Sequence, residues 1–307
     1  MKRRQFIKQT LLASAAVSMV GVDRLSAKST VSYDEVPQEF SSQSFRKSMM
    51  WGTVGIKGSI LEKCRAIKAA GFDGAEFNSH ENREEVLAAM KATGLVASSV
   101  CNSVHWKKPL SSPDPQIQKE GFEGMIVAME DAKAYGTDAV LLVPGTVSEE
   151  VGYDECWNRS TEEIKRLLPI AEKLRVKICI ENVWNNFLLS PMEAVRYIDQ
   201  FESPWVKSYF DIGNIANYGW PDQWIRILGN RIGRVHVKEF SKEKAEKEGR
   251  WKGFDPELLE GDIAWQKVIA SIRKAGYGPW LTIEHKGGDT PEGLKTLATK
   301  LDRIIAM

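Results

Sequence analysis

The stretch VKICIEN, residues 176–182, places a glutamate directly after an apolar run of strand length. Three later stretches have the same form, with an acidic residue or a histidine at the end of a short apolar run: KSYFDIGN (207–214), IGRVHVKEF (232–240) and PWLTIEH (279–285). The segments between them have the apolar spacing of amphipathic helices. Strands that alternate with helices in this way predict a parallel sheet of the α/β class.

The same alternation extends over the chain from residue 47 onward. We predict eight strands, at 48–53, 75–77, 96–101, 139–143, 176–180, 207–210, 232–237 and 280–283. Helices are predicted between them, at 59–70, 82–93, 116–135, 161–174, 191–201, 222–228, 262–275 and 291–305. This order and length predict a single (β/α)8 TIM barrel. The alternative is an open doubly wound sheet, which normally has a glycine-rich turn after its first strand, and GTVG at 52–55 does not match that pattern.

The composition is that of an ordinary soluble domain. Of 307 residues, 42 are basic and 41 acidic, which gives a formal net charge of +1. A protein that binds nucleic acid broadly needs an excess of positive charge, so no nucleic-acid partner is expected.

The N-terminal residues have the layout of an export signal. A basic start, Lys2-Arg3-Arg4, precedes an apolar run at 11–22 and the small residues that end at Ala27. The run RRQFIK at 3–8 resembles a twin-arginine signal. We expect a signal peptide at 1–27, a polar linker at 28–44 and the barrel at 45–307, and therefore a periplasmic or otherwise exported protein. The apolar run is short for a membrane span, so no membrane anchor is expected after signal removal, and the alternative is an amphipathic helix.

Glu181, Asp211, His236 and Glu284 lie at the ends of four of the predicted strands. In a TIM barrel the carboxyl ends of the strands form the active-site face. Because strand side chains alternate in direction, Glu181, His236 and Glu284 should point to the barrel axis. Asp211 follows two aromatic residues, so the alternation assigns its direction less clearly.

Three carboxylates and one imidazole are a suitable ligand set for one divalent metal, Mn²⁺, Mg²⁺, Co²⁺ or Zn²⁺. A sugar bound through its carbonyl would place a C–H bond between Glu181 and Glu284. One carboxylate would remove the proton beside the carbonyl and the other would return it, by way of an enediolate. For each acid taken alone, a salt bridge in the core is the alternative explanation.

Further side chains are expected around this site. All four histidines, His80, His105, His236 and His285, follow predicted strands, which predicts a shared wet cleft. Lys238 has the inward phase of its strand and Lys242 follows it, so both are candidates to contact a phosphate or an oxyanion.

Six aromatic residues fall in predicted loops near the rim, where their faces would stack on sugar C–H surfaces: Trp106, Tyr153, Trp157, Trp184, Trp220 and Trp251. Ordinary packing is the alternative for each. Together they favour a pocket for a hexose or a glycoside over one for a triose. We take His105, Trp106, Trp184, Lys238 and Lys242 as candidate substrate-binding residues.

Five motifs resemble the xylose isomerase-like barrel superfamily, in particular its sugar phosphate isomerase/epimerase branch: CIENVWNN (179–186), YFDIGN (209–214), VHVKEF (235–240), GDIAW (261–265) and GPWLTIE (278–284). The resemblance covers about 45–307. It implies that Glu181, Asp211, His236 and Glu284 hold one divalent metal. It also implies that the two glutamates are the acid/base pair.

The chain departs from the ketose 3-epimerases of that branch at two positions. Those enzymes usually have a substrate-holding histidine three residues after the strand-six aspartate, and here the residue is Asn214, which we take as a further substrate-binding candidate. An arginine six residues after the strand-seven histidine is replaced by Lys242. The endonuclease branch needs more histidines than the four present here.

We therefore expect an exported, divalent-metal-dependent sugar isomerase or epimerase that acts on a small carbohydrate through an enediolate. One alternative is a 3-keto-glycoside lyase or hydratase that uses the same proton abstraction. Another is a sugar-binding barrel without catalysis, which would have no need of the pair Glu181 and Glu284. Assembly into a homo-oligomer stays open.

Overall fold

The computed structural model describes residues 44–307. The predicted signal peptide and all but the last residue of the predicted linker lie outside these residues. Within the described range, none of the helices combines the length and the apolar character that crossing a bilayer requires.

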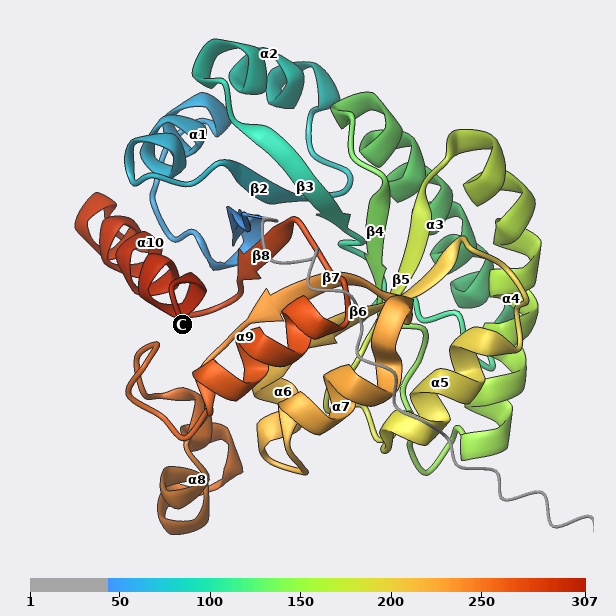
Figure 1. Cartoon of the computed structure of the whole chain (residues 1–307). Helices are drawn as coiled ribbons and strands as arrows, with labels where there is room; N and C mark the ends of the chain where they lie inside the picture. The colour runs from blue at the N-terminus through green and yellow to red at the C-terminus, as the bar shows by residue number, and fades with distance from the viewer. Residues whose placement is uncertain (1–43) are drawn as a thin grey trace, which may run out of the picture. The chain divides into compact units, whose positions relative to one another are not determined.

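Eight parallel strands form a closed barrel in which each strand pairs with the next and β8 pairs with β1 (Figure 1). The strands are β1 (Arg46–Met50), β2 (Gly74–Asn78), β3 (Val96–Cys101), β4 (Ala139–Leu142), β5 (Lys177–Glu181), β6 (Val206–Asp211), β7 (Ile232–Val237) and β8 (Trp280–Ile283). The pair Ser48 and Thr282 belongs to the register that closes the barrel. The prediction of a single TIM barrel is confirmed.

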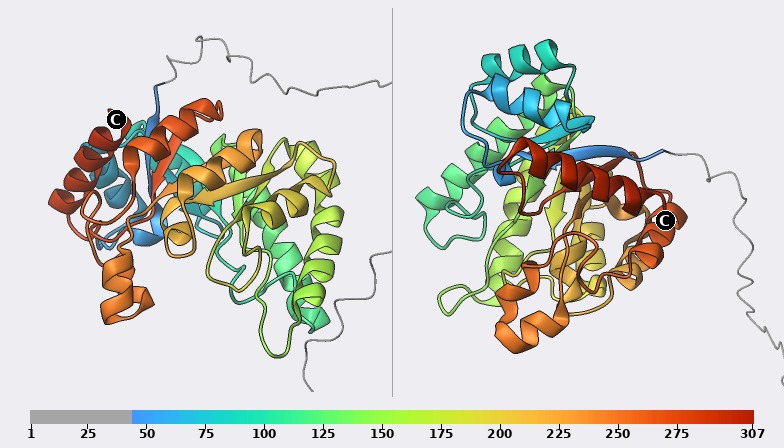
Figure 2. Two further views of the ribbon diagram at one scale, coloured as in Figure 1. Left: turned by 60° about the horizontal axis from the view of Figure 1, so that its bottom comes forward. Right: turned by 90° about the vertical axis from the view of Figure 1, so that its left-hand side faces the viewer.

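Helices surround the barrel and follow the strands in sequence (Figure 2). They are α1 (Ile60–Ala69), α2 (Arg83–Thr93), α3 (Pro115–Tyr135), α4 (Tyr153–Leu174), α5 (Pro191–Asp199), α6 (Ile212–Ala216), α7 (Pro221–Leu228), α8 (Lys242–Glu248), α9 (Trp265–Lys274) and α10 (Pro291–Ile305). Short 3₁₀ helices occur at η2 (Trp51–Thr53), η3 (Gly229–Arg231) and η4 (Arg250–Phe254). The helices α8 and η4 lie in the long connection from β7 to α9, which the sequence did not resolve into elements.

The helix ends follow from the local sequence. Ser59 and Ser190 each begin a helix with a capping box, in which the serine hydroxyl accepts a backbone N–H and a glutamate three residues on accepts the serine N–H. Gly94 and Gly136 end α2 and α3 in the left-handed region, with φ of 66° and 77°.

Helix α4 is longer than predicted. It begins at Tyr153 rather than at residue 161, and the carboxylate of Glu155 accepts the N–H of Gly152 at its start, 2.9 Å away. Tyr153 and Trp157, which were predicted in loops near the rim, therefore lie on this helix. Both rings pack against Phe187, with centroids 5.2 and 6.0 Å apart. The prediction that these two rings lie beside the substrate was wrong, because helix α4 positions both of them against Phe187.

Two sets of side chains fill the core. Outward-facing strand residues such as Ile178 and Ile180 join the large cluster under the helices. Inward-facing residues form a second cluster inside the barrel: Cys101, Ala139, Leu141, Val143, Cys179 and Tyr209. Cys179 thus faces the axis of the barrel, and its isoleucine neighbours face the helices. This inner layer supports the carboxyl ends of the strands, where the polar residues lie.

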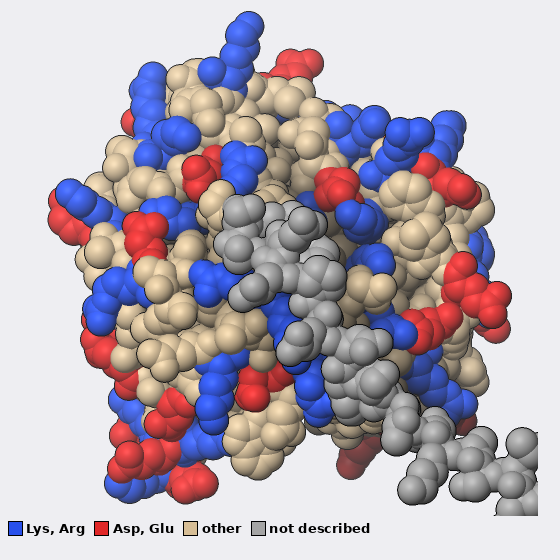
Figure 3. All heavy atoms as spheres, in the orientation of Figure 1, with Lys and Arg blue, Asp and Glu red and all other residues tan. Residues whose placement is uncertain are grey.

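The charged surface residues are mixed in sign. On the face shown in Figure 3, basic and acidic side chains alternate over the described part of the surface. This distribution agrees with the formal net charge of +1.

Candidate functional site

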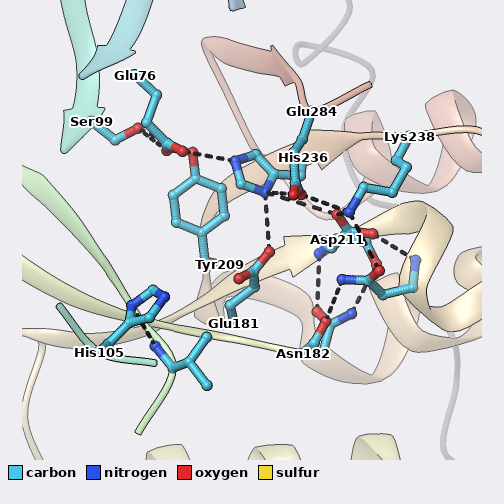
Figure 4. A network of polar contacts seen from close by, with 12 residues as sticks. Glu76, Ser99, His105, Glu181, Asn182, Tyr209, Asp211, His236, Lys238 and Glu284 are labelled. Atoms are coloured by element: carbon cyan, nitrogen blue, oxygen red, sulfur yellow. Dashed lines mark hydrogen bonds and ion pairs between the residues drawn. The ribbon is translucent and has the colours of Figure 1, made fainter. Parts of the chain in front are cut away.

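Glu181, Asp211, His236 and Glu284 meet at the carboxyl end of the barrel (Figure 4). Glu181 and Asp211 are the last residues of β5 and β6, His236 lies in β7, and Glu284 directly follows β8. Strand register places Asp211 opposite His236. One potential ligand atom from each of the four residues lies within 4.8 Å of the others. All four residues were predicted from the sequence, and the fold brings them together.

The orientation of Asp211 follows from the regular alternation of side chains along β6. The register shift in its pairing with β7 skips Gly233 of β7 and leaves β6 itself regular. Tyr209 belongs to the cluster inside the barrel, whereas Phe210 packs under the helices. Asp211 is therefore directed inward, like Tyr209 two residues earlier. Because Tyr209 and Phe210 are both aromatic, the sequence alone did not show which of them faces the barrel axis.

His236 is held between carboxylates on both sides of its ring. Its Nε2 atom lies 3.0 Å from Oε1 of Glu76, and its Nδ1 atom lies 3.1 Å from Oε1 of Glu181 and 3.1 Å from Oε2 of Glu284. A neutral imidazole that donates Nε2–H to Glu76 would direct the lone pair of Nδ1 at two carboxylate oxygens. That arrangement is repulsive unless a cation lies between them, and it is the arrangement found around metal-bound histidines.

Glu76 was missed by the sequence analysis. It is fully buried on β2, and its other oxygen, Oε2, accepts hydrogen bonds from the hydroxyl of Ser99, at 2.6 Å, and from the hydroxyl of Tyr209. Three donors therefore fix one carboxylate behind His236. The available signal was a glutamate between Ala75 and Phe77 in a predicted strand, where an isolated charge is costly to bury.

Two carboxylate oxygens of the site lack an aligned hydrogen bond. Oδ2 of Asp211 and Oε2 of Glu284 are enclosed, and no described residue gives either a hydrogen bond of good geometry. The ammonium group of Lys238 lies 3.3 Å from the first and 2.8 Å from the second, so its contribution is mainly charge. Buried carboxylate oxygens without an aligned hydrogen bond are suitable ligand atoms for a metal ion.

Charge is unbalanced around this site. Glu76, Glu181, Asp211 and Glu284 surround His236 and Lys238, so carboxylates outnumber cationic groups. Burial raises the pKa of Glu181, with added repulsion from Glu284, although the hydrogen bond from His236 opposes it. Burial also raises the pKa of Asp211, to about 7. A divalent cation would supply the missing charge, so the donor set fits one.

For Glu284 and His236, the neighbouring charges outweigh the effect of burial on the pKa. Burial acts to raise the pKa of Glu284, but the charges of Lys238 and His236 outweigh it and hold that pKa below its usual value. Burial acts to lower the pKa of His236, and the surrounding carboxylates, Glu76 first, raise it well above its usual value. Without a metal the ring therefore keeps a proton that a bound metal would displace.

Asn182 and Asn214 fix the backbone around Asp211. Oδ1 of Asn182 accepts the N–H of Asp211 at 3.0 Å, and its Nδ2 donates to the carbonyl of Asp211 at 2.8 Å. The N–H of Asn214 donates to Oδ1 of Asp211 at 2.6 Å. Between them, Gly213 permits close approach to β7, since a Cβ there would lie 2.8 Å from Cβ of Lys238. These contacts explain the local sequences EN and DIGN.

A pocket of about 360 Å³ is lined by two of the four candidate ligands, Glu181 and Glu284. It contains five of the six predicted substrate-binding residues, namely His105, Trp106, Trp184, Asn214 and Lys238. Its other lining residues are Met50, Asn78, Cys101, Asn102, Ser103, Leu141, Glu181, Val183, Trp251 and Glu284. Asn78 and Asn102 were not predicted, although each stands at the end of a strand, which was the signal available.

Lys242 is the predicted contact that does not line the pocket. It is the first residue of α8, and its Nζ atom lies 4.7 Å from the ring centroid of Trp220 and 3.4 Å from the carbonyl oxygen of Gly219. The start of a helix at this position turns the side chain toward the outer rim. The prediction that Lys242 contacts the substrate is therefore not supported, because its side chain does not line this pocket.

His105 is a neutral hydrogen-bond donor to the pocket. Its Nδ1 atom accepts the N–H of Val143 at 3.3 Å, so the remaining proton of the neutral ring is on Nε2. Burial lowers the pKa of His105 to about 4. The predicted cleft shared by all four histidines was wrong for His80 and His285, which do not line the pocket. His285 instead has Nε2 2.9 Å from the carbonyl oxygen of Pro256.

Residues 64–304 match the protein family described as Xylose isomerase-like TIM barrel. Among curated proteins, the L-ribulose-5-phosphate 3-epimerase UlaE of Salmonella paratyphi C is 28% identical over 238 residues, which cover 72% of this chain and 80% of that protein.

Two solved structures of sugar epimerases have the same fold. The 3-keto-D-glucoside 4-epimerase YcjR of E. coli superposes with a TM-score of 0.73 at 16% identity, covering 86% of this chain and 100% of that one. The D-psicose 3-epimerase of Clostridium cellulolyticum H10 with D-tagatose gives 0.69 at 17% identity, covering 85% and 98%. At these identities the likeness shows the barrel itself.

Proposed function

The chain belongs to the xylose isomerase-like TIM-barrel family, and from that premise we propose that it is a divalent-metal-dependent enzyme that epimerises or isomerises a sugar. The observation that carries the proposal is the group Glu181, Asp211, His236 and Glu284, whose ligand atoms lie within 4.8 Å of one another. The sugar epimerases among the similar proteins support the reaction class.

Glu181 and Glu284 are the proposed acid/base pair. Both line the pocket, and each has an oxygen 3.1 Å from Nδ1 of His236. One carboxylate removes the proton from the carbon next to the sugar carbonyl, and the electron pair of that C–H bond forms the C=C bond of an enediolate. The other carboxylate returns a proton to the opposite face of the same carbon, which inverts its configuration.

Isomerisation needs the same residues with a different second step. The proton returns to the former carbonyl carbon, while the hydroxyl proton passes to the former carbonyl oxygen. A divalent cation held by the four side chains would polarise the carbonyl and stabilise the enediolate charge. Lys238, Asn214 and His105 line the pocket, and their N–H groups are the proposed donors to the sugar oxygens in either reaction.

Proton exchange tests this proposal directly. The protein would be loaded with Mn²⁺, Co²⁺, Mg²⁺ or Zn²⁺ and incubated in D₂O with free ketoses and 3-keto-sugars, and NMR would follow deuterium at the carbon beside the carbonyl. We expect exchange that a chelator abolishes. Glu284→Gln should lose it, whereas Glu163→Gln, at a buried carboxylate on α4, should keep it. Full exchange by Glu284→Gln with its metal still bound would disprove the mechanism.

Analysis of the products separates the alternatives. Proton abstraction from a 3-keto-glycoside at the carbon between C1 and the carbonyl can expel the substituent at C1, which is the lyase reaction. Release of that substituent would identify a lyase, and recovery of an inverted or isomerised sugar would identify an epimerase or isomerase. Binding without any exchange would identify a sugar-binding barrel.

Export through a twin-arginine signal is a separate proposal, based on the layout of residues 1–27. Cell fractionation of the full chain would test it, with Arg3→Lys and Arg4→Lys combined as the variant. We expect the wild type in the exported fraction and the variant inside the cell. Equal distribution of the two would contradict the proposal.

A further inference from the structure

Three tryptophans line the pocket that Glu181 and Glu284 also line. Trp106, Trp184 and Trp251 all line the cavity, and they come from the loop after β3, the loop after β5 and the 3₁₀ helix η4. Trp106 is 55% exposed and Trp251 is 61% exposed. Large apolar rings left open to water beside a pocket mark a surface that another group covers.

Trp184 is held by a hydrogen bond to the segment that follows Asp211. Its Nε1 atom donates to the carbonyl oxygen of Asn214 at 2.9 Å, so the ring is fixed relative to the residue that bonds Asp211. The ring of Trp251 lies 4.6 Å from that of Trp184, and Phe254 supports Trp184 from 4.9 Å. A substituent on a sugar held near Glu181 and Glu284 would thus meet a preformed aromatic surface.

The pocket has little free positive charge for a phosphate. Among its described lining residues, the basic side chains are Lys238 and His105. Lys238 is engaged with Asp211 and Glu284 (Figure 4), and His105 is neutral. Phosphate sites normally use uncommitted arginine or lysine side chains or a helix N-terminus. Arg250 lies over the Trp184 and Trp251 rings, 5.3 and 5.2 Å from their centroids, and is not part of the lining.

We propose that Trp106, Trp184 and Trp251 form a subsite for a second ring, joined through a glycosidic oxygen to the sugar that reacts. The substrate class is then a keto-glycoside with a cyclic substituent, not a sugar phosphate. The proposal rests on the proposed function for the sugar at Glu181 and Glu284. Aromatic faces stack on apolar ring surfaces, and the cavity of about 360 Å³ is in the size range of pockets that bury ligands larger than one small ring.

Matched ligands test the subsite by binding alone. The full chain loaded with Mn²⁺ would be titrated by calorimetry with methyl and phenyl 3-keto-β-D-glucoside, and with L-ribulose and L-ribulose 5-phosphate. We expect the phenyl glycoside to bind about tenfold more tightly than the methyl glycoside. Phosphorylation of ribulose should not tighten binding. Equal dissociation constants for the two glycosides, or tighter binding of the phosphate, would overturn the proposal.

Tryptophan variants locate the effect. Trp251→Ala and Trp106→Ala should each reduce the phenyl preference while the dissociation constant for the methyl glycoside changes by less than about twofold. Trp220→Ala is the matched control, because Trp220 is 60% exposed on the same rim but does not line the pocket. An unchanged preference in both test variants, with melting temperatures like that of the wild type, would also overturn the subsite.

The two proposals fail in different ways. If metal-dependent deuterium exchange occurs with the methyl glycoside but the phenyl group adds no affinity, the subsite is wrong and the enzyme function stands. If the phenyl preference depends on Trp251 but no sugar exchanges deuterium, the subsite stands and the enzyme function is wrong.

Discussion

The Nε2 atom of His236 lies 3.0 Å from Oε1 of Glu76, a residue 160 positions earlier in the chain, and neither side chain is exposed. Ser99 and Tyr209 hydrogen-bond the other oxygen of that carboxylate. The ring is thereby oriented with Nδ1 toward Glu181 and Glu284. Carboxylates in this position fix the tautomer of a metal-binding histidine and increase its basicity.

We predict that Glu76→Gln weakens the binding of Mn²⁺ by about 10- to 100-fold, since partners of this kind typically have that effect on affinity. Isothermal titration of the metal-free protein measures it. Glu163→Gln is the control, because Glu163 is also a buried carboxylate but pairs with Arg166 on α4. An affinity within twofold of the wild type for Glu76→Gln would show that the contact is structural only.

Lys238 should matter most for stability when no metal is bound. Its ammonium group lies 2.8 Å from Glu284 and 3.3 Å from Asp211, and removal of one partner from a buried ion pair costs about 3–5 kcal/mol. We predict that Lys238→Met lowers the free energy of unfolding by that order in chelator and by less with Mn²⁺, because the cation then balances the carboxylates. Urea unfolding under both conditions measures the difference.

The control for this prediction is Lys300→Met. Lys300 also contacts two carboxylates, Glu257 and Glu260, but both of these are more than half exposed. Its removal should cost about 1 kcal/mol or less, and equally with and without Mn²⁺. If Lys238→Met showed the same loss under both conditions, its role as a charge substitute would be refuted.

His105 should make folding depend on pH. Burial lowers its pKa from 6.5 to about 4, so between these values the unfolded chain binds a proton that the folded chain does not. The contribution of His105 to the free energy of unfolding is fully present above pH 6.5. It is lost as the pH falls toward 4, and the total loss is about 3 kcal/mol. We predict a smaller loss in His105→Asn, whose Oδ1 atom can still accept the N–H of Val143.

Urea unfolding of both proteins at several pH values between 7 and 4.5, in chelator throughout, tests this dependence. Chelator is needed because metal release at low pH would otherwise add its own effect. The two proteins are compared by how their free energies of unfolding change with pH, because the substitution also alters packing at every pH. Parallel curves for the wild type and His105→Asn would contradict the prediction.

Glu239 should control the long β7–α9 connection that carries Trp251. It is fully buried, and its carboxylate accepts the N–H of Leu259 at 2.7 Å, the indole N–H of Trp265 at 2.9 Å and the N–H of Ile263 at 3.3 Å. We predict that Glu239→Gln destabilises the fold by about 1–3 kcal/mol, because the amide keeps only one acceptor oxygen.

Hydrogen exchange identifies where that loss occurs. In Glu239→Gln the amides of Leu259 and Ile263 should exchange faster, while those of α3 should keep their wild-type rates. If amide exchange became faster by the same factor in all helices and strands, the loss would be global. Glu239 would then have no special role in the β7–α9 connection.

The sequence alone determined the architecture and most of the candidate site. Strand-length apolar runs that alternate with capped helices are a local signal, so eight strands and a closed barrel followed from it. Glu181, His236 and Glu284 followed as well, because the two-residue period of a strand assigns direction without knowledge of its neighbours. Helix α4 was the main local error, since its polar first turns carry little apolar periodicity.

Only the tertiary structure decided which distant groups meet. Asp211 lies opposite His236 because of the register between β6 and β7, and Glu76 reaches His236 because β2 and β7 belong to one closed barrel. The fold also separated Trp251 at the pocket from Trp157 in helix packing and from Lys242 at the outer rim. A residue's own neighbours specify its strand and face, whereas contacts across the barrel depend on closure and register, which no single segment contains.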